Sequence, residues 1–308
     1  YQGLAALVLS LAALSACATT SSVPRGSTPV VADDAIVTAT ILQMNDVYEI
    51  MPLGGSGLGG LARVATLRRQ LEAENPNTFT VLAGDVLSPS ALSSARAGTG
   101  GGALNGEQMV DLMNRVGLDY AVFGNHEFDL RQPDFDKRMA ESKFTWVASN
   151  VFDAGGVPFP FAKTNVVLTA TNAAGRTFRI GIFGLTLDSN SAPYVSYRDP
   201  FDIARAQVTA LAGESDIVVA LTHLAFAQDE QLAETVPGLS LILGGHEHLN
   251  INAHRGAGFT PVLKADSNAK SVYIHRLVYN TATKSLDVDS DLVEITSAIP
   301  ADPDVAAA

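Results

Sequence analysis

The chain has 308 residues, of which 47% are hydrophobic, 17% are charged and one is a cysteine. This balance is typical of a packed globular protein and excludes a disordered chain and a small domain held together by disulfides. The formal net charge of −12 disfavours long nucleic acids as partners, because their backbones are negative too, although inward-facing carboxylates could hold cations.

The first residues have the pattern of a secretion signal. Leu4 to Ala16 is apolar apart from two serines, and it is too short to span a membrane. Leu14 to Cys17 resembles the lipobox of bacterial lipoproteins, whose cysteine carries a lipid. We expect residues 1–17 to be a partial lipoprotein signal peptide and residues 18–35 a flexible tether, which would place the protein on the periplasmic side of the bacterial cell envelope. The alternative is a buried free cysteine on a core helix.

Short apolar runs bounded by turn residues predict strands that are buried on both faces. In chain order these runs are Ile36–Met44, Phe79–Ala83, Tyr120–Phe123, Phe144–Ser149, Phe178–Leu185, Ile217–Leu221 and Leu239–Leu243. Apolar residues at helical spacing predict helices around 61–71 and 109–116. From about Val262 to Val293 the pattern predicts antiparallel strands. The alternation indicates an α/β sandwich.

Two glycine clusters, at 54–60 and 98–102, predict long mobile loops of the kind that often rim a site. We expect residues 36–296 to form the catalytic domain. Residues 297–308 have the pattern of a turn, an N-cap and the first turn of a helix. We expect them to begin a linker toward a further C-terminal domain.

Polar motifs follow five of the predicted strands. They are Asn45-Asp46-Val47-Tyr48, Gly84-Asp85, Gly124-Asn125-His126-Glu127, Thr222-His223 and Gly244-Gly245-His246-Glu247-His248. Each motif alone is a weak signal, since Gly-Asp is an ordinary turn and Asn-His an ordinary cap. Ligands of open α/β sheets bind at the carboxyl ends of strands, so these motifs are expected to converge on one crevice.

The order of the motifs resembles the calcineurin-like metallophosphoesterases, whose pattern is Asp-x-His, Gly-Asp, Gly-Asn-His-Asp/Glu, His and Gly-His-x-His. The resemblance covers about 36–293. It implies a four-layer αββα sandwich with mixed β-sheets flanked by helices. It also implies a two-metal site, because two cations neutralise the charge of a phosphate ester and activate a bridging water.

The same resemblance implies a role for each polar residue. Asp85 would bridge the two metals. The other ligands would be Asp46 and His248 for the first metal, and Asn125, His223 and His246 for the second. Mixed imidazole and carboxylate ligands favour Zn, Mn, Fe or Co over Ca or Mg. We therefore expect two divalent Zn or Mn ions, or a mixed site with Fe.

A catalytic pair follows from the 5′-nucleotidase branch of this family. There the histidine of the Gly-Asn-His motif approaches the substrate phosphate, and an aspartate three residues later orients its ring. His126 and Asp129 match these two positions, and the imidazole could donate a proton to a phosphoryl or leaving oxygen. The alternative for Asp129 is a helix cap, and Glu127 is interpreted as structural.

Tyr48 departs from the family pattern, because the family has a histidine there. Three accounts stay open. Tyr48 could bind a strongly acidic metal such as ferric iron as a phenolate, which requires loss of a proton with a pKa of ~10. It could point away and leave its ligand place to water. The site could also have decayed in a binding protein. We include Tyr48 among the candidate metal ligands on the first account.

The expected function is metal-dependent hydrolysis of phosphate monoesters, with 5′-nucleotides as the leading substrates and His126 assisting. A 2′,3′-cyclic nucleotide phosphodiesterase or a UDP-sugar hydrolase would use the same site. A lipid-anchored, non-catalytic metal- or phosphate-binding protein is the alternative of another class, but it would not need His126 and Asp129.

The expected partners are a small phosphorylated substrate and, through a lipid on Cys17 alone, a membrane. Long nucleic acid is not expected, and the protein is expected to be a monomer. Four residues, Arg131, Tyr194, Tyr197 and Arg198, could contact substrate. Lone loop residues of this kind are more often part of the surface.

Overall fold

The computed structural model describes residues 33–95, 102–190 and 192–308. Residues from Asp33 to Ala308 belong to one unit. The predicted signal peptide with Cys17 lies outside the described residues, as do most of the predicted tether and most of the second glycine cluster. Predictions about these segments stay predictions.

In the described part of the chain, the first three motifs extend from a seven-stranded mixed sheet with the order β15-β14-β1-β2-β3-β4-β6. Five neighbouring strands of this sheet are parallel: β1 (Ile36–Met44), β2 (Thr78–Ala83), β3 (Tyr120–Val122), β4 (Thr145–Val147) and β6 (Ala162–Lys163). On the other side of β1 follow β14 (Ser271–Asn280) and β15 (Ser285–Glu294), each antiparallel to its neighbour.

The last two motifs extend from a second sheet, with the order β12-β13-β11-β10-β8-β7 among the described residues. Its parallel strands are β8 (Thr177–Thr186), β10 (Ile217–His223), β11 (Leu241–Gly244) and β13 (Thr260–Lys264). At its edges β7 (Asn165–Thr171) and β12 (Ile251–Arg255) are antiparallel. A small separate ribbon pairs β5 (Val151–Asp153) with β9 (Val195–Tyr197).

The antiparallel prediction for the C-terminal strands is right for β14 and β15 and half right for β13, which is antiparallel to β12 and parallel to β11. β12 runs back along the sheet before β13 begins, so β13 returns in the direction of β11. The sequence pattern does not indicate β12, because its residues are only half-buried or exposed.

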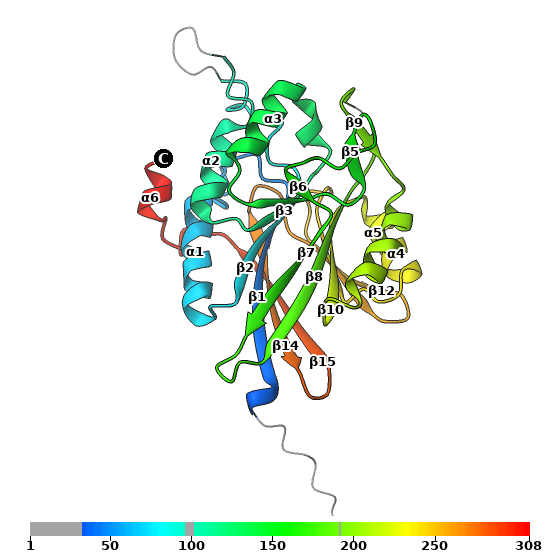
Figure 1. Cartoon of the computed structure of the whole chain (residues 1–308). Coiled ribbons are helices and arrows are strands. Elements are labelled where there is room, and N and C mark those ends of the chain that lie inside the picture. Colours follow the sequence, from blue (N-terminus) through cyan, green and yellow to red (C-terminus); the bar gives the residue numbers. More distant parts are fainter. Residues whose placement is uncertain (1–32, 96–101, 191) are drawn as a thin grey trace, which may run out of the picture. The chain divides into compact units, whose positions relative to one another are not determined.

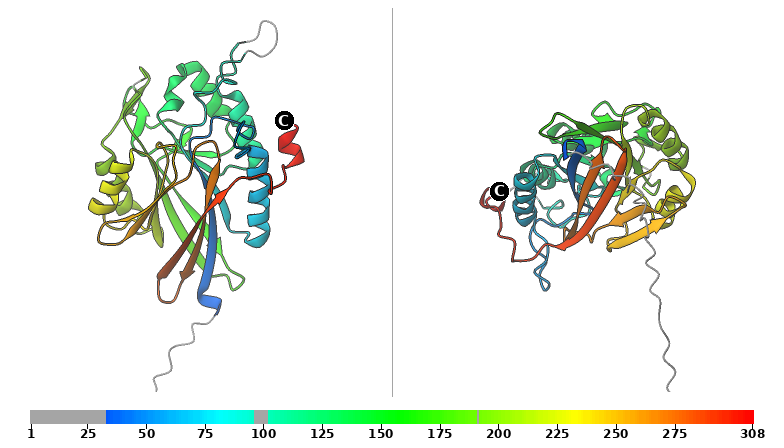
Figure 2. Two further views of the ribbon diagram at one scale, coloured as in Figure 1. Left: turned by 180° about the vertical axis from the view of Figure 1, so that it is seen from behind. Right: turned by 90° about the horizontal axis from the view of Figure 1, so that it is seen from below.

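Helices cover the outer face of each sheet (Figures 1 and 2). The first sheet is covered by α1 (Leu61–Glu74), α2 (Glu107–Val116) and α3 (Gln132–Glu141), and the second by α4 (Pro200–Leu211) and α5 (Phe226–Thr235). Apolar side chains of both sheets pack between them as a third core layer. The predicted four-layer αββα sandwich is therefore confirmed, and the two helices predicted from apolar spacing are present with those residues buried.

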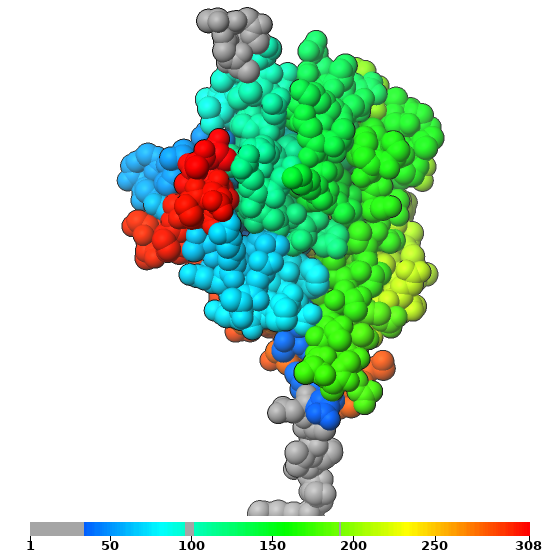
Figure 3. Space-filling model, turned by 60° about the vertical axis from the view of Figure 1, so that its left-hand side comes forward, coloured from blue at the N-terminus to red at the C-terminus, as the bar shows by residue number. Residues whose placement is uncertain are grey.

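The C-terminal residues pack against α1 and α2, where Figure 3 shows them in red. The predicted N-cap is Asp302, whose carboxylate accepts hydrogen bonds from the backbone of α6 (Pro303–Ala306). Arg69 of α1 pairs with the same carboxylate. Among the described residues, none of the helices has the length and apolar character needed to cross a membrane.

Candidate metal centre

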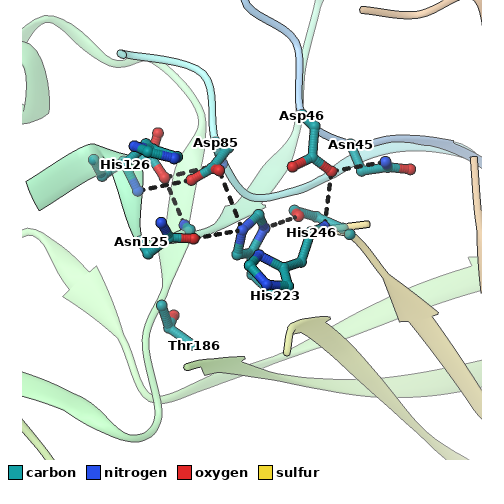
Figure 4. Close-up of polar contacts among 12 residues, drawn as sticks. Asn45, Asp46, Asp85, Asn125, His126, Thr186, His223 and His246 are labelled. Carbon is teal, nitrogen blue, oxygen red and sulfur yellow. Dashed lines mark hydrogen bonds and ion pairs between the residues drawn. The ribbon is translucent and has the colours of Figure 1, made fainter. Parts of the chain in front are cut away.

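The five polar motifs meet at one end of the two sheets. Figure 4 shows Asp46, Asp85, Asn125, His223 and His246 gathered there. They follow or end β1, β2, β3, β10 and β11. The convergence predicted from strand ends is what the structure shows, because parallel strands of both sheets present their carboxyl ends to the same side.

Several of these residues have a left-handed backbone, which L-residues rarely adopt. The φ angles are 53° at Asp46, 59° at Asp85, 88° at His246 and 61° at His248. The amide of Asp46 donates a hydrogen bond to the carbonyl oxygen of Gly84 at 3.0 Å. Such bonds between the two aspartate loops hold Asp46 and Asp85 in this conformation. Strained backbone of this kind clusters at functional sites, where the surrounding structure maintains it.

Two glycines allow the close approach of the loops. A side chain at Gly84 would overlap with the ring of His223, and one at Gly124 would overlap with the carboxylate of Asp85. The glycines of the Gly-Asp and Gly-Asn-His motifs are therefore required by the packing of the site itself.

The centre of the site consists of Asp46, Asp85 and His223, whose ligand atoms all lie within 4.8 Å of one another. None of the three is more than 1% exposed. Nε2 of His223 lies 3.2 Å from Oδ2 of Asp85. Among the described residues, neither aspartate forms an ion pair with a lysine or arginine.

The other candidate ligands form two groups that meet at Asp85. On one side, the Tyr48 hydroxyl lies 2.8 Å from Oδ2 of Asp85 and 3.1 Å from Nε2 of His248, and that same nitrogen lies 3.2 Å from Oδ1 of Asp46. On the other side, Nε2 of His223 lies 3.1 Å from Oδ1 of Asn125. The rings of His223 and His246 are 5.3 Å apart between centroids.

The carboxylates set the protonation of this centre. Burial alone would lower the pKa of His223, but the neighbouring Asp85 and Asp46 outweigh it and raise this pKa to about 9. Burial would likewise raise the pKa of Asp85, yet His223 and hydrogen bonds from His126 and Tyr48 lower it. Without a metal, the centre is therefore a carboxylate and imidazolium pair at neutral pH.

Tyr48 points into the site, which contradicts the account in which it turns away. Its side chain is buried and its hydroxyl donates to Asp85. Burial and the charges of Asp85 and Asp46 raise the pKa of Tyr48 far above its ordinary value. These surroundings favour a neutral phenol that donates a hydrogen bond.

Glu127 is structural, as interpreted from the sequence. It is fully buried, and its carboxylate accepts backbone hydrogen bonds from Asp85, Val86, Leu87 and Gly124. Burial and the charge of Asp85 raise the pKa of Glu127 to about 7. One side chain thus ties the loop of the second motif to the loop of the third.

His126 and Asp129 form the predicted pair at the rim of the site, in the 3-10 turn η2 (His126–Asp129). Nδ1 of His126 lies 2.8 Å from Oδ2 of Asp129, and both side chains are about one third exposed, at 35% and 32%. Asp129 is not a helix cap, because the N-cap of α3 is Arg131.

Sequence reasoning missed the residues that hold this pair and the Asp46 loop. Ser88 and Asn190 donate to the carboxylate of Asp129. Asn45 donates to Asp46 at 2.8 Å, and the side chain of Asn268 accepts from the amide of Tyr48 at 2.9 Å. Only Asn45 stands inside a recognisable motif; the others come from distant loops without a local signal.

The four suspected substrate contacts differ in their surroundings. Arg131 is exposed and pairs with Asp134. Tyr194 is buried instead of lying on the surface, with its hydroxyl donating to Leu130. Tyr197 lies in β9 rather than in a loop, and Arg198 stacks over the ring of Phe152. The two tyrosines pack against Phe128 and so support η2.

Divalent cations fit this donor set. Two buried carboxylates lie side by side next to imidazoles, and burial of like charges is costly unless cations compensate it. Carboxylate, amide and imidazole donors together suit Zn or Mn. The residues that would hold such ions are Asp46, Asp85, Asn125, His223, His246 and His248, with Tyr48 beside them.

Comparisons with known proteins agree with this geometry. The family model described as calcineurin-like phosphoesterase matches residues 39–250. The snake venom 5′-nucleotidase of Gloydius brevicauda is 27% identical in an alignment of length 223 that covers 67% of this chain and 36% of that protein. The trifunctional nucleotide phosphoesterase protein YfkN of Bacillus subtilis is 26% identical in an alignment of length 249 that covers 70% of this chain and 16% of that protein.

A solved structure shows the same fold. The crystal structure of a 5′-nucleotidase precursor from Thermus thermophilus matches with a TM-score of 0.74 and 25% identity, covering 88% of this chain and 57% of that chain. This chain thus spans well under two thirds of these relatives. With its five strand-end motifs gathered around Asp85, the chain belongs to the calcineurin-like phosphoesterases and is a metallophosphoesterase related to 5′-nucleotidases.

Proposed function

We propose that this protein hydrolyses phosphate monoesters, with 5′-nucleotides as its substrate class, at a site for two divalent metal ions. The observation that carries the proposal is the position of Asp85. Its Oδ2 contacts Tyr48 in one group of candidate ligands and His223 in the other. A carboxylate that serves two cations needs such a place between two ligand sets.

Each candidate residue of the metal centre then has a role. The bound ions would neutralise phosphoryl oxygens and activate a water for attack. Asp46 and His248 would hold one ion, Asn125, His223 and His246 the other, and Asp85 both. Glu127 keeps Asp85 in place through the backbone hydrogen bonds that it accepts.

His126 would assist the chemistry from the rim. Asp129 accepts the hydrogen bond of Nδ1 and fixes the ring, so Nε2 is the nitrogen that meets a phosphoryl or leaving-group oxygen. An imidazole oriented in this way is placed for proton transfer with that oxygen. A protein that only binds metal or phosphate would not need this oriented pair, which supports the enzyme over the binding protein.

The names of the relatives support nucleotides as substrates, since they are called 5′-nucleotidases and a nucleotide phosphoesterase. The test is phosphate release by chelator-treated protein that has been reconstituted with Mn²⁺ or Zn²⁺. AMP and other 5′-nucleotides, a 2′,3′-cyclic nucleotide and a UDP-sugar form the substrate panel. We expect 5′-nucleotides to be the fastest. Metal-loaded protein that hydrolyses none of the panel would overturn the proposal.

We also propose a lipid anchor at Cys17 on the periplasmic side of the cell envelope, on a monomeric protein. The sequence Leu14 to Cys17 supports the anchor. Cys17→Ser should move the protein from the membrane fraction to the soluble fraction, and detection of the two forms in fractionated cells measures it. An unchanged distribution would contradict the anchor.

A further inference from the structure

A fully buried lysine lies behind the histidines of the candidate metal centre. Lys264 is the last residue of β13, beside Gly244 of β11, and it is 0% exposed. Its ammonium group donates to the carbonyl oxygens of Leu224 and Gly245, each at 2.8 Å. It also contacts the carboxylates of Asp229 and Glu247.

The absence of a side chain at Gly244 leaves the space that the Lys264 side chain occupies. A side chain at Gly244 would overlap with the aliphatic part of Lys264 and press on Asp229. Asp229 lies in α5 and is also 0% exposed. Taking such charges out of water is costly and is not in itself a route to stability. Stabilisation of the fold therefore does not explain why this lysine is buried with four polar partners.

Three of the four partners adjoin a histidine of the centre in the sequence, whereas Asp229 lies in α5. Leu224 directly follows His223, Gly245 directly precedes His246, and Glu247 stands between His246 and His248. The other oxygen of Glu247 accepts the amide of Phe226 at the start of α5. A single ammonium group thus holds the main chain directly after His223, at the end of β10, and on the loop that carries His246 and His248.

We infer that Lys264 is a positioning residue, which holds the end of β10 at His223 and the loop of His246 and His248 at the spacing that divalent metal binding requires. The inference rests on the proposed function. Asp229 and Glu247 are the counter-charges that allow the ammonium group to be buried. Residues that support metal ligands from behind typically change metal affinity or activity by ~10- to 100-fold when mutated.

The test measures Mn²⁺ affinity by calorimetric titration of chelator-treated protein. Lys264→Met should weaken Mn²⁺ binding by ~10- to 100-fold. Saturating Mn²⁺ should restore most of kcat, because the reacting groups themselves are unchanged. Lys163→Met is the matched control: Lys163 also ends a strand, β6, but is exposed, and this variant should bind Mn²⁺ like the wild type.

A second variant separates positioning from folding. Lys264→Met leaves Asp229 buried without its partner and could unfold the protein, whereas Lys264→Met with Asp229→Leu replaces the buried ion pair by apolar groups, which is often neutral for stability. We expect this double variant to lose less thermal stability than Lys264→Met, to stay folded, and still to bind Mn²⁺ ~10- to 100-fold more weakly. The carbonyls of Leu224 and Gly245 would still lack their donor.

The outcomes are distinct. A stable double variant with wild-type Mn²⁺ affinity would overturn the inference and leave the proposed function intact. Wild-type protein that binds no Mn²⁺ or Zn²⁺ would overturn the proposed function and the inference with it. Weaker binding in both Lys264 variants, together with normal binding in Lys163→Met, would support the inference.

Discussion

The buried centre and the exposed pair of this site are built in different ways. Asp46, Asp85 and His223 are at most 1% exposed; His223 ends β10, and the two aspartates lie on loops that backbone hydrogen bonds tie together. His126 and Asp129 are about one third exposed, at 35% and 32%, and are held by side chains such as Ser88 and Asn190.

The difference fits two separate tasks. Metal ligands must keep their spacing, and rigid loops with a buried carboxylate such as Glu127 provide this. A group that exchanges protons with substrate must be reached from outside, so it lies at the rim. Mutations in the centre should therefore affect metal content and activity together, while mutations at the rim should affect activity alone.

The largest effect is expected for Asp85→Asn. Loss of the shared carboxylate should remove at least one metal and lower kcat by roughly 10⁴-fold, because metal stabilisation of the phosphoryl group is worth several kcal/mol. Elemental analysis beside a phosphate-release assay measures both. A variant that keeps two metals and most of its activity would remove Asp85 from the bridging role.

His126→Ala tests the rim. It should lower kcat by ~10² to 10⁴-fold with unchanged metal content, since assistance by a general acid is of that size. Asp129→Asn should cost less, because His126 remains in place. Metal content is the discriminating measurement: if metal is lost with activity in His126→Ala, the residue belongs to the centre and the distinction between the two regions fails.

The pH dependence of metal-free protein tests the charge of the centre. The pKa of His223 is raised from 6.5 to about 9 in the folded state. Its contribution to stability should therefore be complete below pH 6.5 and be lost as the pH rises through about 9. Unfolding of chelator-treated protein by urea at several pH values should show a loss of at most roughly 3 kcal/mol. His223→Gln should flatten this dependence.

Metal affinity should follow the opposite trend. Metal binding has to displace the proton of His223, so the affinity should rise by about tenfold per pH unit up to the pKa of His223. Affinity independent of pH between 7 and 9 would indicate that His223 is already neutral in the metal-free protein.

The smallest effect is expected for Tyr48→Phe. A neutral phenol that donates to Asp85 contributes a hydrogen bond to a charged group, so its loss should weaken metal binding by about tenfold. The native protein should be colourless, and Tyr48→His should increase the preference for divalent Zn or Mn. A visible tyrosinate-to-iron band in native protein that disappears in Tyr48→Phe would restore the phenolate account.

Most of the fold could be predicted from local patterns. Apolar runs predicted β1 to the residue and β10 to within two residues, because strands buried on both faces consist mostly of apolar residues. Edge strands such as β12 and β7 were missed, since their outward residues are polar. The parallel pairing of β13 with β11 was not predicted either, because it depends on the reversal of the chain through β12.

The sequence by itself determined which residue types stand at the strand ends, and therefore the convergence of Asp46, Asp85, Asn125 and the histidines. Only the tertiary structure decided what surrounds them. That Tyr48 donates to Asp85, and that Lys264 holds Gly245, depends on loops brought together from distant parts of the chain. Strand ends are encoded locally by periodicity, whereas burial, charge and hydrogen-bond partners depend on which loops the packed sheets place side by side.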